Sequence, residues 1–273
     1  ILLTGFTQVL GQGKESYRQA CDQLVRMLEG KDSIHFKKAV FITENAYFDN
    51  SLNYDRFDTQ IQLFAEMCRR VGDQPKFTNV RNNLPYNWAI HRFITDTLPF
   101  ILHGDTLKKL PYRYDTLDPT GQKEITNTFV VKLLQTGTGN CRSLNYLYKI
   151  LADELNAEAN LVLAPYHLFV SHRDAPNRYN ERKVYNLELT NGSFPRDGWI
   201  VAGSYITWKA MRNGLYMTDL DAKQNIALCI GDLAVSYERK FGTDDFLISL
   251  YQTAIRYFPQ NPQNRVRLAE CYR

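Results

Sequence analysis

The stretch of this 273-residue chain that most constrains its fold runs from residue 137 to residue 190, where one helical pattern precedes several short strand-like runs. Apolar residues recur at helical spacing after Cys141, at Leu144, Leu147, Ile150, Leu151 and Leu155. Strand-like runs follow at residues 159–164, 167–172 and 184–189, with the polar residues 173–182 as a loop, and residues 198–201 indicate a fourth strand. One helix packed by several later strands predicts an α+β core.

Helical patterns lie on both sides of this core. Residues 17–28, 36–47 and 57–72 each carry an amphipathic pattern, and Gly30 is a stop signal after the first. Further helices are predicted over residues 88–97 and 121–134. We therefore divide the chain into a helical N-terminal region (1–110), a core (111–217) and a helical C-terminal region (218–273).

Three residues of the core are suited to nucleophilic chemistry. Cys141 follows a turn with two glycines, Gly137 and Gly139, and begins the helical pattern. A thiol at a helix start is favoured as the anion by unpaired backbone N–H groups and the helix dipole. His167 and Glu188 follow on later strands, in the order base and orienter. The alternative for Cys141 alone is a buried thiol acting as a small apolar side chain.

The C-terminal region repeats itself. Leu233-Ala234-x-x-Tyr237 returns as Leu268-Ala269-x-x-Tyr272, with Tyr251, Ala254 and Pro259 between them. This resembles the tetratricopeptide repeat, in which small and aromatic residues let two antiparallel helices pack closely. A plain helical hairpin packed on the core is the alternative.

Residues 130–200 resemble the transglutaminase-like (papain-like cysteine) superfamily. The resemblance rests on Gly139-Asn140-Cys141, the helix to Leu155, Asn156-Ala157-Glu158-Ala159, Ala164-Pro165-Tyr166-His167 and Asn186-Leu187-Glu188-Leu189-Thr190-Asn191-Gly192. More narrowly, the chain is similar to bacterial proteins, mostly from Bacteroidetes, that join such a domain to tetratricopeptide repeats. The resemblance implies a papain-like fold, in which the cysteine-bearing helix packs on an antiparallel sheet.

The resemblance also implies a Cys–His–Asp triad, which carries over to Cys141, His167 and Glu188, with Glu in place of the commoner Asp. Asn186, two residues earlier on the same predicted strand face, is the alternative orienter. Gln135 precedes Cys141 by an offset that suits an oxyanion donor in papain-like enzymes, or it is a solvated side chain in the last turn of a helix. His172 is predicted to face away from His167, at the surface.

Composition narrows the function. The net charge of +4 is spread along the chain without a basic tract, so a nucleic-acid partner is not indicated. The five cysteines lack metal-ligand spacing, so we expect no metal site. Gly137-x-Gly139 is too short for a phosphate loop, so we expect no nucleotide cofactor. No run approaches eighteen apolar residues, so we expect no integral membrane segment. Residues 1–13 are largely apolar, and the chain becomes polar at Lys14. This pattern is typical of the end of a secretory signal, which would indicate an exported protein. The alternative is an apolar first helix of a cytoplasmic protein.

These observations favour a cysteine-dependent acyl transfer on an amide or peptide bond, with hydrolysis (peptidase or amidase) preferred to cross-linking. The alternative is a catalytically inactive scaffold that binds a peptide or protein through its C-terminal helices. A third possibility is a vestigial triad, with Glu188 too far from His167. The substrate and the oligomeric state are not predicted.

Overall fold

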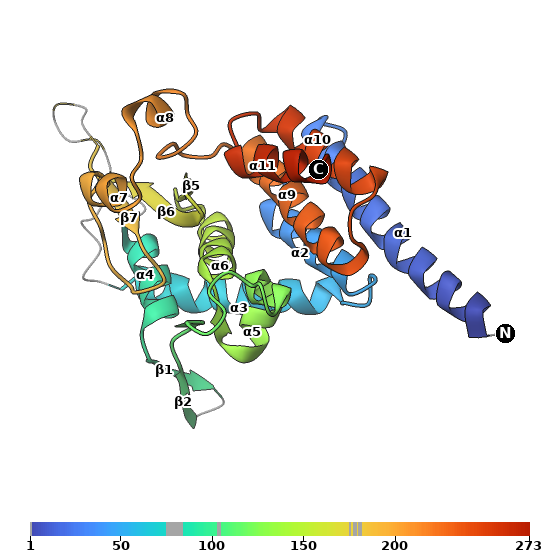
Figure 1. The fold of residues 1–273 in the computed structure, drawn as a ribbon. Helices are drawn as coiled ribbons and strands as arrows, with labels where there is room; N and C mark the ends of the chain where they lie inside the picture. Colours follow the sequence, from blue (N-terminus) through green and yellow to red (C-terminus); the bar gives the residue numbers. More distant parts are fainter. Residues whose placement is uncertain (1, 75–83, 103–104, 175, 177–178, 180–181) are drawn as a thin grey trace. The chain divides into compact units, whose positions relative to one another are not determined.

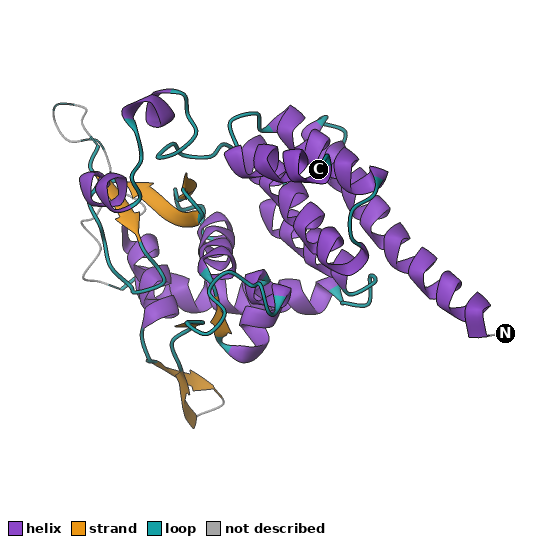
Figure 2. Cartoon of the chain, in the orientation of Figure 1, coloured by secondary structure: helices purple, strands orange, loops and turns teal. Residues whose placement is uncertain are grey.

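The computed structural model describes residues 2–273, with gaps at 75–83, 103–104, 175, 177–178 and 180–181. The chain forms two compact units. The helical unit comprises residues 1–54, 213–215 and 220–273, and the mixed unit comprises residues 55–212 and 216–219. Helices and small sheets are both present (Figure 2), so the α+β class predicted from the sequence is confirmed.

The mixed unit contains a three-stranded antiparallel sheet. Its strands are β5 (Asn160–Ala164), β6 (His167–Arg173) and β7 (Val184–Leu187), in that order. The predicted strands are confirmed, although β7 ends two residues earlier than expected. The ladder between β6 and β7 begins at Val170, so the first residues of β6 have no partner on β7.

Helix α6 (Cys141–Glu154) packs against β5 and β6 (Figure 1). The five apolar positions that predicted this helix are all buried. Their spacing of three and four residues places them on one stripe, and burial of that stripe against the sheet stabilises the helix. Helices α4 (Leu84–Thr95) and α5 (Val130–Thr136) pack on α6 as well.

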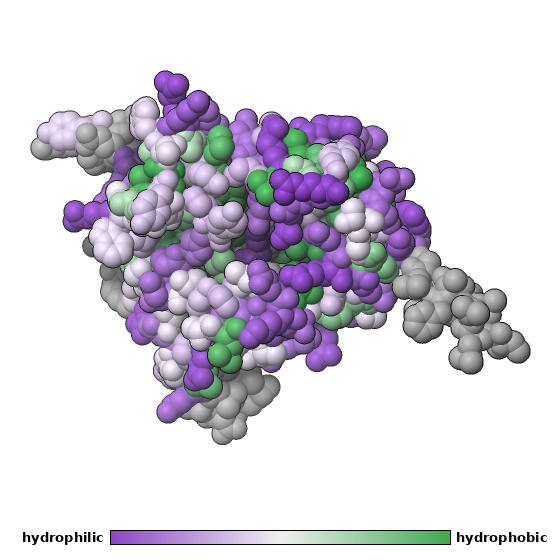
Figure 3. Space-filling view, in the orientation of Figure 1, coloured by the Kyte–Doolittle hydropathy of each residue, from purple (hydrophilic) through white to green (hydrophobic). Residues whose placement is uncertain are grey.

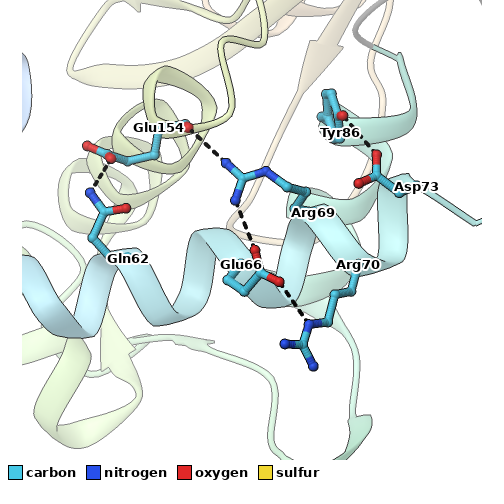
Figure 4. A network of polar contacts seen from close by, with 7 residues as sticks. All are labelled: Gln62, Glu66, Arg69, Arg70, Asp73, Tyr86 and Glu154. Carbon is cyan, nitrogen blue, oxygen red and sulfur yellow. Dashed lines mark hydrogen bonds and ion pairs between the residues drawn. The ribbon is translucent and has the colours of Figure 1, made fainter.

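Polar contacts join α3 (Tyr54–Gly72) to the C-terminal end of α6 (Figure 4). Gln62 Nε2 donates to Glu154 Oε2 at 2.5 Å, and an Arg69 N–H donates to the Glu154 carbonyl at 3.4 Å. The guanidinium of Arg69 also bonds Glu66, which in turn bonds Arg70. The carbonyl contact matters because the last carbonyls of a helix lack intrahelical partners.

The predicted fourth strand is wrong: residues 198–201 lie in helix α7 (Asp197–Gly203). Ile200 and Val201 both pack on a small cluster formed by sheet residues and Ile206, whereas Trp199 is exposed. Two consecutive inward side chains suit a helix, because a strand would alternate them. A short helix α8 (Trp208–Arg212) follows.

The region before α6 also differs from prediction. The helix expected over residues 121–134 is divided into a 3-10 turn, η2 (Ile125–Thr128), and α5, because Phe129 between them is extended. Asn127 turns its buried side chain to Asp115 and Asp118, which holds this turn in place. A short parallel pair, β3 (Arg113–Tyr114) with β4 (Thr138–Gly139), and a hairpin of β1 (Leu98–Leu102) and β2 (Asp105–Lys109) were not predicted.

The helical unit contains α1 (Leu2–Leu28), α2 (Phe36–Tyr47), α9 (Ala222–Phe241), α10 (Asp245–Tyr257) and α11 (Pro262–Cys271). Helices α1, α2 and α9 pack on one another, α10 packs on α9, and α11 packs on α10. The buried rings of Tyr17 and Tyr237 meet edge to face, with 5.2 Å between centroids. The predicted helices over residues 17–28, 36–47 and 57–72 are confirmed.

Hydrophilic side chains predominate on the visible face of Figure 3, with hydrophobic ones in small groups between them. Among the described residues, none of the helices has both the length and the apolar character needed to cross a bilayer.

Candidate functional site

Cys141 is the first residue of α6, and the cap before it is complete. The side-chain oxygen of Asn140 accepts hydrogen bonds from the backbone N–H groups of Arg142 (2.9 Å) and Ser143 (3.4 Å). The Ser143 hydroxyl accepts from Asn140 N–H at 3.1 Å, which completes a capping box. Cys141 therefore lies at the positive end of a well-formed helix, where a thiolate is favoured.

The two glycines before Cys141 serve different purposes. Gly137 ends α5 in the left-handed conformation, with φ of 71°, which glycine adopts without steric cost. Gly139 has no room for a side chain, because a Cβ there would overlap Ser143 Oγ. The glycine turn therefore lets the chain enter the capping box that places Cys141.

His167 is the first residue of β6, directly after a tight turn in which Tyr166 has φ of 55°. Its Nε2 lies 2.5 Å from Glu188 Oε2. The imidazole and the thiol of Cys141 also lie close enough to interact, because each shifts the pKa of the other towards the charged form. Because Nε2 faces the carboxylate, Nδ1 is the ring nitrogen left available to the thiol. The structure thus brings Cys141, His167 and Glu188 together.

The carboxylate of Glu188 is held at both oxygens. Its Oε2 faces His167, and its Oε1 accepts from the N–H (3.1 Å) and the hydroxyl (2.6 Å) of Thr190. Glu188 lies just beyond β7, where it forms an isolated bridge with Ser193. The same turn contacts α4, since His91 Nε2 lies 3.2 Å from the Gly192 carbonyl. These contacts orient the carboxylate and, through it, the imidazole ring.

The two alternative site residues lie elsewhere. Asn186 is buried and donates to the Pro195 carbonyl (3.1 Å) and to Asp197 (2.6 Å), so its amide is directed away from His167. Because β7 ends at Leu187, Glu188 does not continue the pleat that would have put it on the face of Asn186. Gln135 is exposed in the last turn of α5.

The charges of the three residues support one another. Burial raises the pKa of the Cys141 thiol, but the hydrogen bond and positive charge of His167 outweigh it and leave the pKa below its ordinary value. Burial lowers the pKa of His167, but contacts with Cys141 and Glu188 raise it to about 10. Burial raises the pKa of Glu188, but His167 and Thr190 lower it overall. At neutral pH this favours a thiolate, an imidazolium and a carboxylate in a row.

Several neighbours were missed by the sequence analysis. Asn145 bridges the start of α6 and β6, and Thr190 holds Glu188. Tyr114, on β3, lies near enough to Cys141 and Glu188 that their negative charges add to burial in raising its pKa. The i+4 spacing of Asn145 from Cys141 was a usable signal for a shared helix face, whereas Tyr114 reaches the site only through the pairing of β3 with β4.

The surface position predicted for His172 is wrong: it is 4% exposed and stacks on Tyr185, with ring centroids 5.0 Å apart. His172 lies on the same sheet face as Leu168 and Val170, and that face is buried. The opposite face of the sheet, which packs on the cluster around Ile206, is buried as well, so neither face of β6 lies at the surface. Burial lowers the pKa of His172 to about 4, so this side chain is neutral at pH 7.

Within the described residues, no group of three or more His, Cys, Asp and Glu side chains is arranged to hold a metal ion. The three side chains of the site together form an arrangement suited to nucleophilic chemistry: a thiolate, an imidazolium able to give and take a proton, and a carboxylate that orients it. Comparison of the chain with protein-family models, curated proteins and solved structures finds no significant match.

Proposed function

We propose that the mixed unit is a cysteine-dependent acyl-transfer enzyme acting on an amide or peptide bond, with Cys141 as nucleophile, His167 as general base and acid, and Glu188 as orienter. The observation that carries the proposal is that one imidazole lies 2.5 Å from the carboxylate of Glu188 and also interacts with the thiol at the start of α6. A third group that holds the base in one orientation is the arrangement by which a weak nucleophile is activated.

The proposed reaction has two halves. Cys141 Sγ attacks the carbonyl carbon, the carbon–nitrogen bond breaks, and the proton on His167 goes to the leaving amine. The resulting thioester is then attacked by water, whose proton passes to His167, and the carbon–sulfur bond breaks to release the acid and restore the thiolate. Asn140 already occupies the N–H groups of Arg142 and Ser143, so the Cys141 N–H is the first-turn donor for the oxyanion.

The finer fold assignment belongs to the same proposal. A cysteine at the start of a helix that packs on an antiparallel sheet, with the histidine on that sheet and the carboxylate just after its last strand, resembles the arrangement of transglutaminase-like and papain-like enzymes. We prefer hydrolysis to cross-linking, because water can reach the partly exposed imidazole, whose side chain is 29% exposed.

The chain's own cysteines offer a matched test. Cys21 and Cys271 are half-buried like Cys141, but burial raises their thiol pKa, to about 11 for Cys21. A comparison of these two cysteines with Cys141 therefore separates the effect of thiol ionisation from the effect of reagent access. At pH 6, iodoacetamide should alkylate Cys141 about tenfold faster or more than either of them, as followed by mass spectrometry of each cysteine peptide.

The variant His167→Ala should lose this selectivity, because the positive partner of the thiolate is gone. Turnover is tested with a mixture of fluorogenic peptide amides, to which hydroxylamine is added to trap the thioester as a hydroxamate. Equal alkylation of Cys141, Cys21 and Cys271 in the wild-type protein would contradict the proposed mechanism. Selective alkylation without any turnover or trapped thioester would instead favour an inactive scaffold.

We further infer that α9, α10 and α11 form tetratricopeptide-like packing. Of the two sets of positions that suggested the repeat, Leu233, Ala234 and Tyr237 are fully buried on α9. The second set, Leu268, Ala269 and Tyr272, is only partly buried or exposed. A close approach between helices supports it as well, because a Cβ on Gly231 of α9 would lie 2.7 Å from Asn264 Oδ1 of α11. The change Gly231→Ala should therefore lower the unfolding midpoint, and an unchanged midpoint would contradict this packing.

A further inference from the structure

We propose that Asn145 is a positioning residue, whose side-chain amide ties the start of α6 to the start of β6 and so sets the separation of Cys141 and His167. This inference rests on the proposed function, because it concerns the same thiol and imidazole. It adds a residue that does not itself contact the reacting groups of the substrate.

The contacts of Asn145 span α6 and β6, the two elements that carry Cys141 and His167. These two elements pack on each other (Figure 1). Its Nδ2 donates to the carbonyl of Cys141 at 2.6 Å, one turn earlier on α6. The same nitrogen donates to the carbonyl of Leu168 at 2.6 Å, on β6. Leu168 is the residue after His167, and the side chain of Asn145 is fully buried. One amide group therefore connects the residue of the nucleophile to the neighbour of the base.

The edge of β6 explains why Leu168 is free to make this contact. The β6–β7 ladder starts at Val170, so the backbone groups that Leu168 presents on the β7 side of β6 are not paired with β7. In a strand, the N–H and the carbonyl of one residue point to the same side. At Leu168 this side faces α6: the carbonyl accepts from Asn145, and the N–H on the same side helps to lower the pKa of the Cys141 thiol. The helix thus replaces the missing strand partner.

The orientation of the Asn145 amide is determined by its partners. Both are carbonyl oxygens, which only accept, so the NH₂ group must face them and the oxygen must face away. That oxygen, Oδ1, is buried and has no hydrogen-bond partner among the residues that the structure describes. A buried polar atom left unpaired is unfavourable for stability. The two hydrogen bonds that Asn145 donates therefore account for the presence of an amide at this buried position, because they fix the geometry of the site.

The consequence of losing these donors is a longer or looser thiol–imidazole contact. The attraction between a thiolate and an imidazolium weakens as their separation grows, and small displacements of reacting groups have large kinetic effects. Without the bridge, the Leu168 N–H, which helps to lower the pKa of the Cys141 thiol, would also be held less firmly beside it. Both changes disfavour the thiolate.

The test is the pH dependence of Cys141 alkylation by iodoacetamide in the full chain. Asn145→Ala removes both hydrogen bonds. Asn145→Ser is the milder second variant, because a helical serine can still bond the carbonyl four residues earlier but cannot reach Leu168. The matched control is Asn87→Ala: Asn87 is equally buried and donates to the Glu158 carbonyl at 3.1 Å, away from Cys141.

Both Asn145 variants should show a higher apparent thiol pKa, with alkylation at pH 6 slowed about tenfold for each pH unit of increase, and with an unchanged rate on the alkaline plateau. Asn87→Ala should lower the unfolding midpoint and leave the pH profile as in the wild type. Asn145 variants that lower only the unfolding midpoint would overturn the inference, and so would a normal profile in Asn145→Ser. If the wild-type profile itself resembles that of an ordinary thiol, it is the proposed function that fails.

Discussion

Replacing Glu188 by glutamine would remove one negative charge from the site while nearly conserving its shape. A glutamine can still accept the hydrogen bonds of Thr190 through its oxygen, and its NH₂ group would face Nε2 of His167. An amide donor opposite Nε2 requires that nitrogen to accept, which favours the neutral ring over the imidazolium. The change therefore acts on the protonation of His167 more than on packing.

The size of the effect follows from the contact that is lost. The imidazole and carboxylate approach to 2.5 Å, and their side chains are 29% and 18% exposed, so water screens the pair only in part. Hydrogen bonds to charged groups contribute about 1.5–3 kcal/mol. Since about 1.4 kcal/mol corresponds to one pH unit, the pKa of His167 should fall by about one to two pH units in Glu188→Gln. It starts from about 10.

The assay is NMR titration of the imidazole Cε1–H resonances, assigned with His167→Ala. His172 serves as the internal reference, because its pKa of about 4 reflects burial and its neighbours rather than Glu188. A His167 pKa that is unchanged in Glu188→Gln, with His172 also unchanged, would refute the claim that the carboxylate holds the imidazolium.

The same pair predicts how stability depends on pH. Folding raises the pKa of His167, so its contribution to stability is complete below its ordinary value of 6.5 and is lost as the pH rises through about 10. Folding lowers the pKa of Glu188, so its contribution is present above its ordinary value of 4.5 and is lost as the pH falls through its folded value. The free energy of unfolding lost in Glu188→Gln should be greatest between pH 4.5 and 6.5. A loss that is constant from pH 4 to 10 in denaturant titrations would contradict this.

Three further substitutions test the frame around the site. Asn140→Ala removes the helix cap and should lower the free energy of unfolding by about 1 kcal/mol in denaturant titrations, and it should slow Cys141 alkylation at pH 6; an unchanged alkylation rate would separate the cap from the chemistry. Gly139→Ala places a Cβ against Ser143 Oγ and should destabilise by about 1–3 kcal/mol, so a loss below about 0.5 kcal/mol would show that the turn relaxes easily. His172 is neutral when folded but gains a proton below pH 6.5 when unfolded, so the wild type should lose stability as the pH falls towards 4. His172→Phe should reduce the loss between pH 7 and 5 by about 2 kcal/mol, and an equal loss in both proteins would count against the assigned pKa.

Local patterns were enough to predict the main elements of the mixed unit. The period of apolar residues after Cys141 predicted α6, and the short β-rich runs predicted β5, β6 and β7, because each pattern records which face of an element is buried. The prediction failed at residues 198–201, where a short apolar run fits either a strand or a helix. Packing of Ile200 and Val201 on the sheet decided for a helix.

The sequence by itself determined which side chains have the chemistry for a nucleophile, a base and an orienter, and that a glycine turn and a helix start precede the thiol. Only the tertiary structure decided that Glu188 rather than Asn186 faces His167, because that depends on where β7 stops, and it alone brought Asn145 to Leu168 and Tyr114 to the site. Strand ends and edges are set by pairing between distant segments, which no local pattern records.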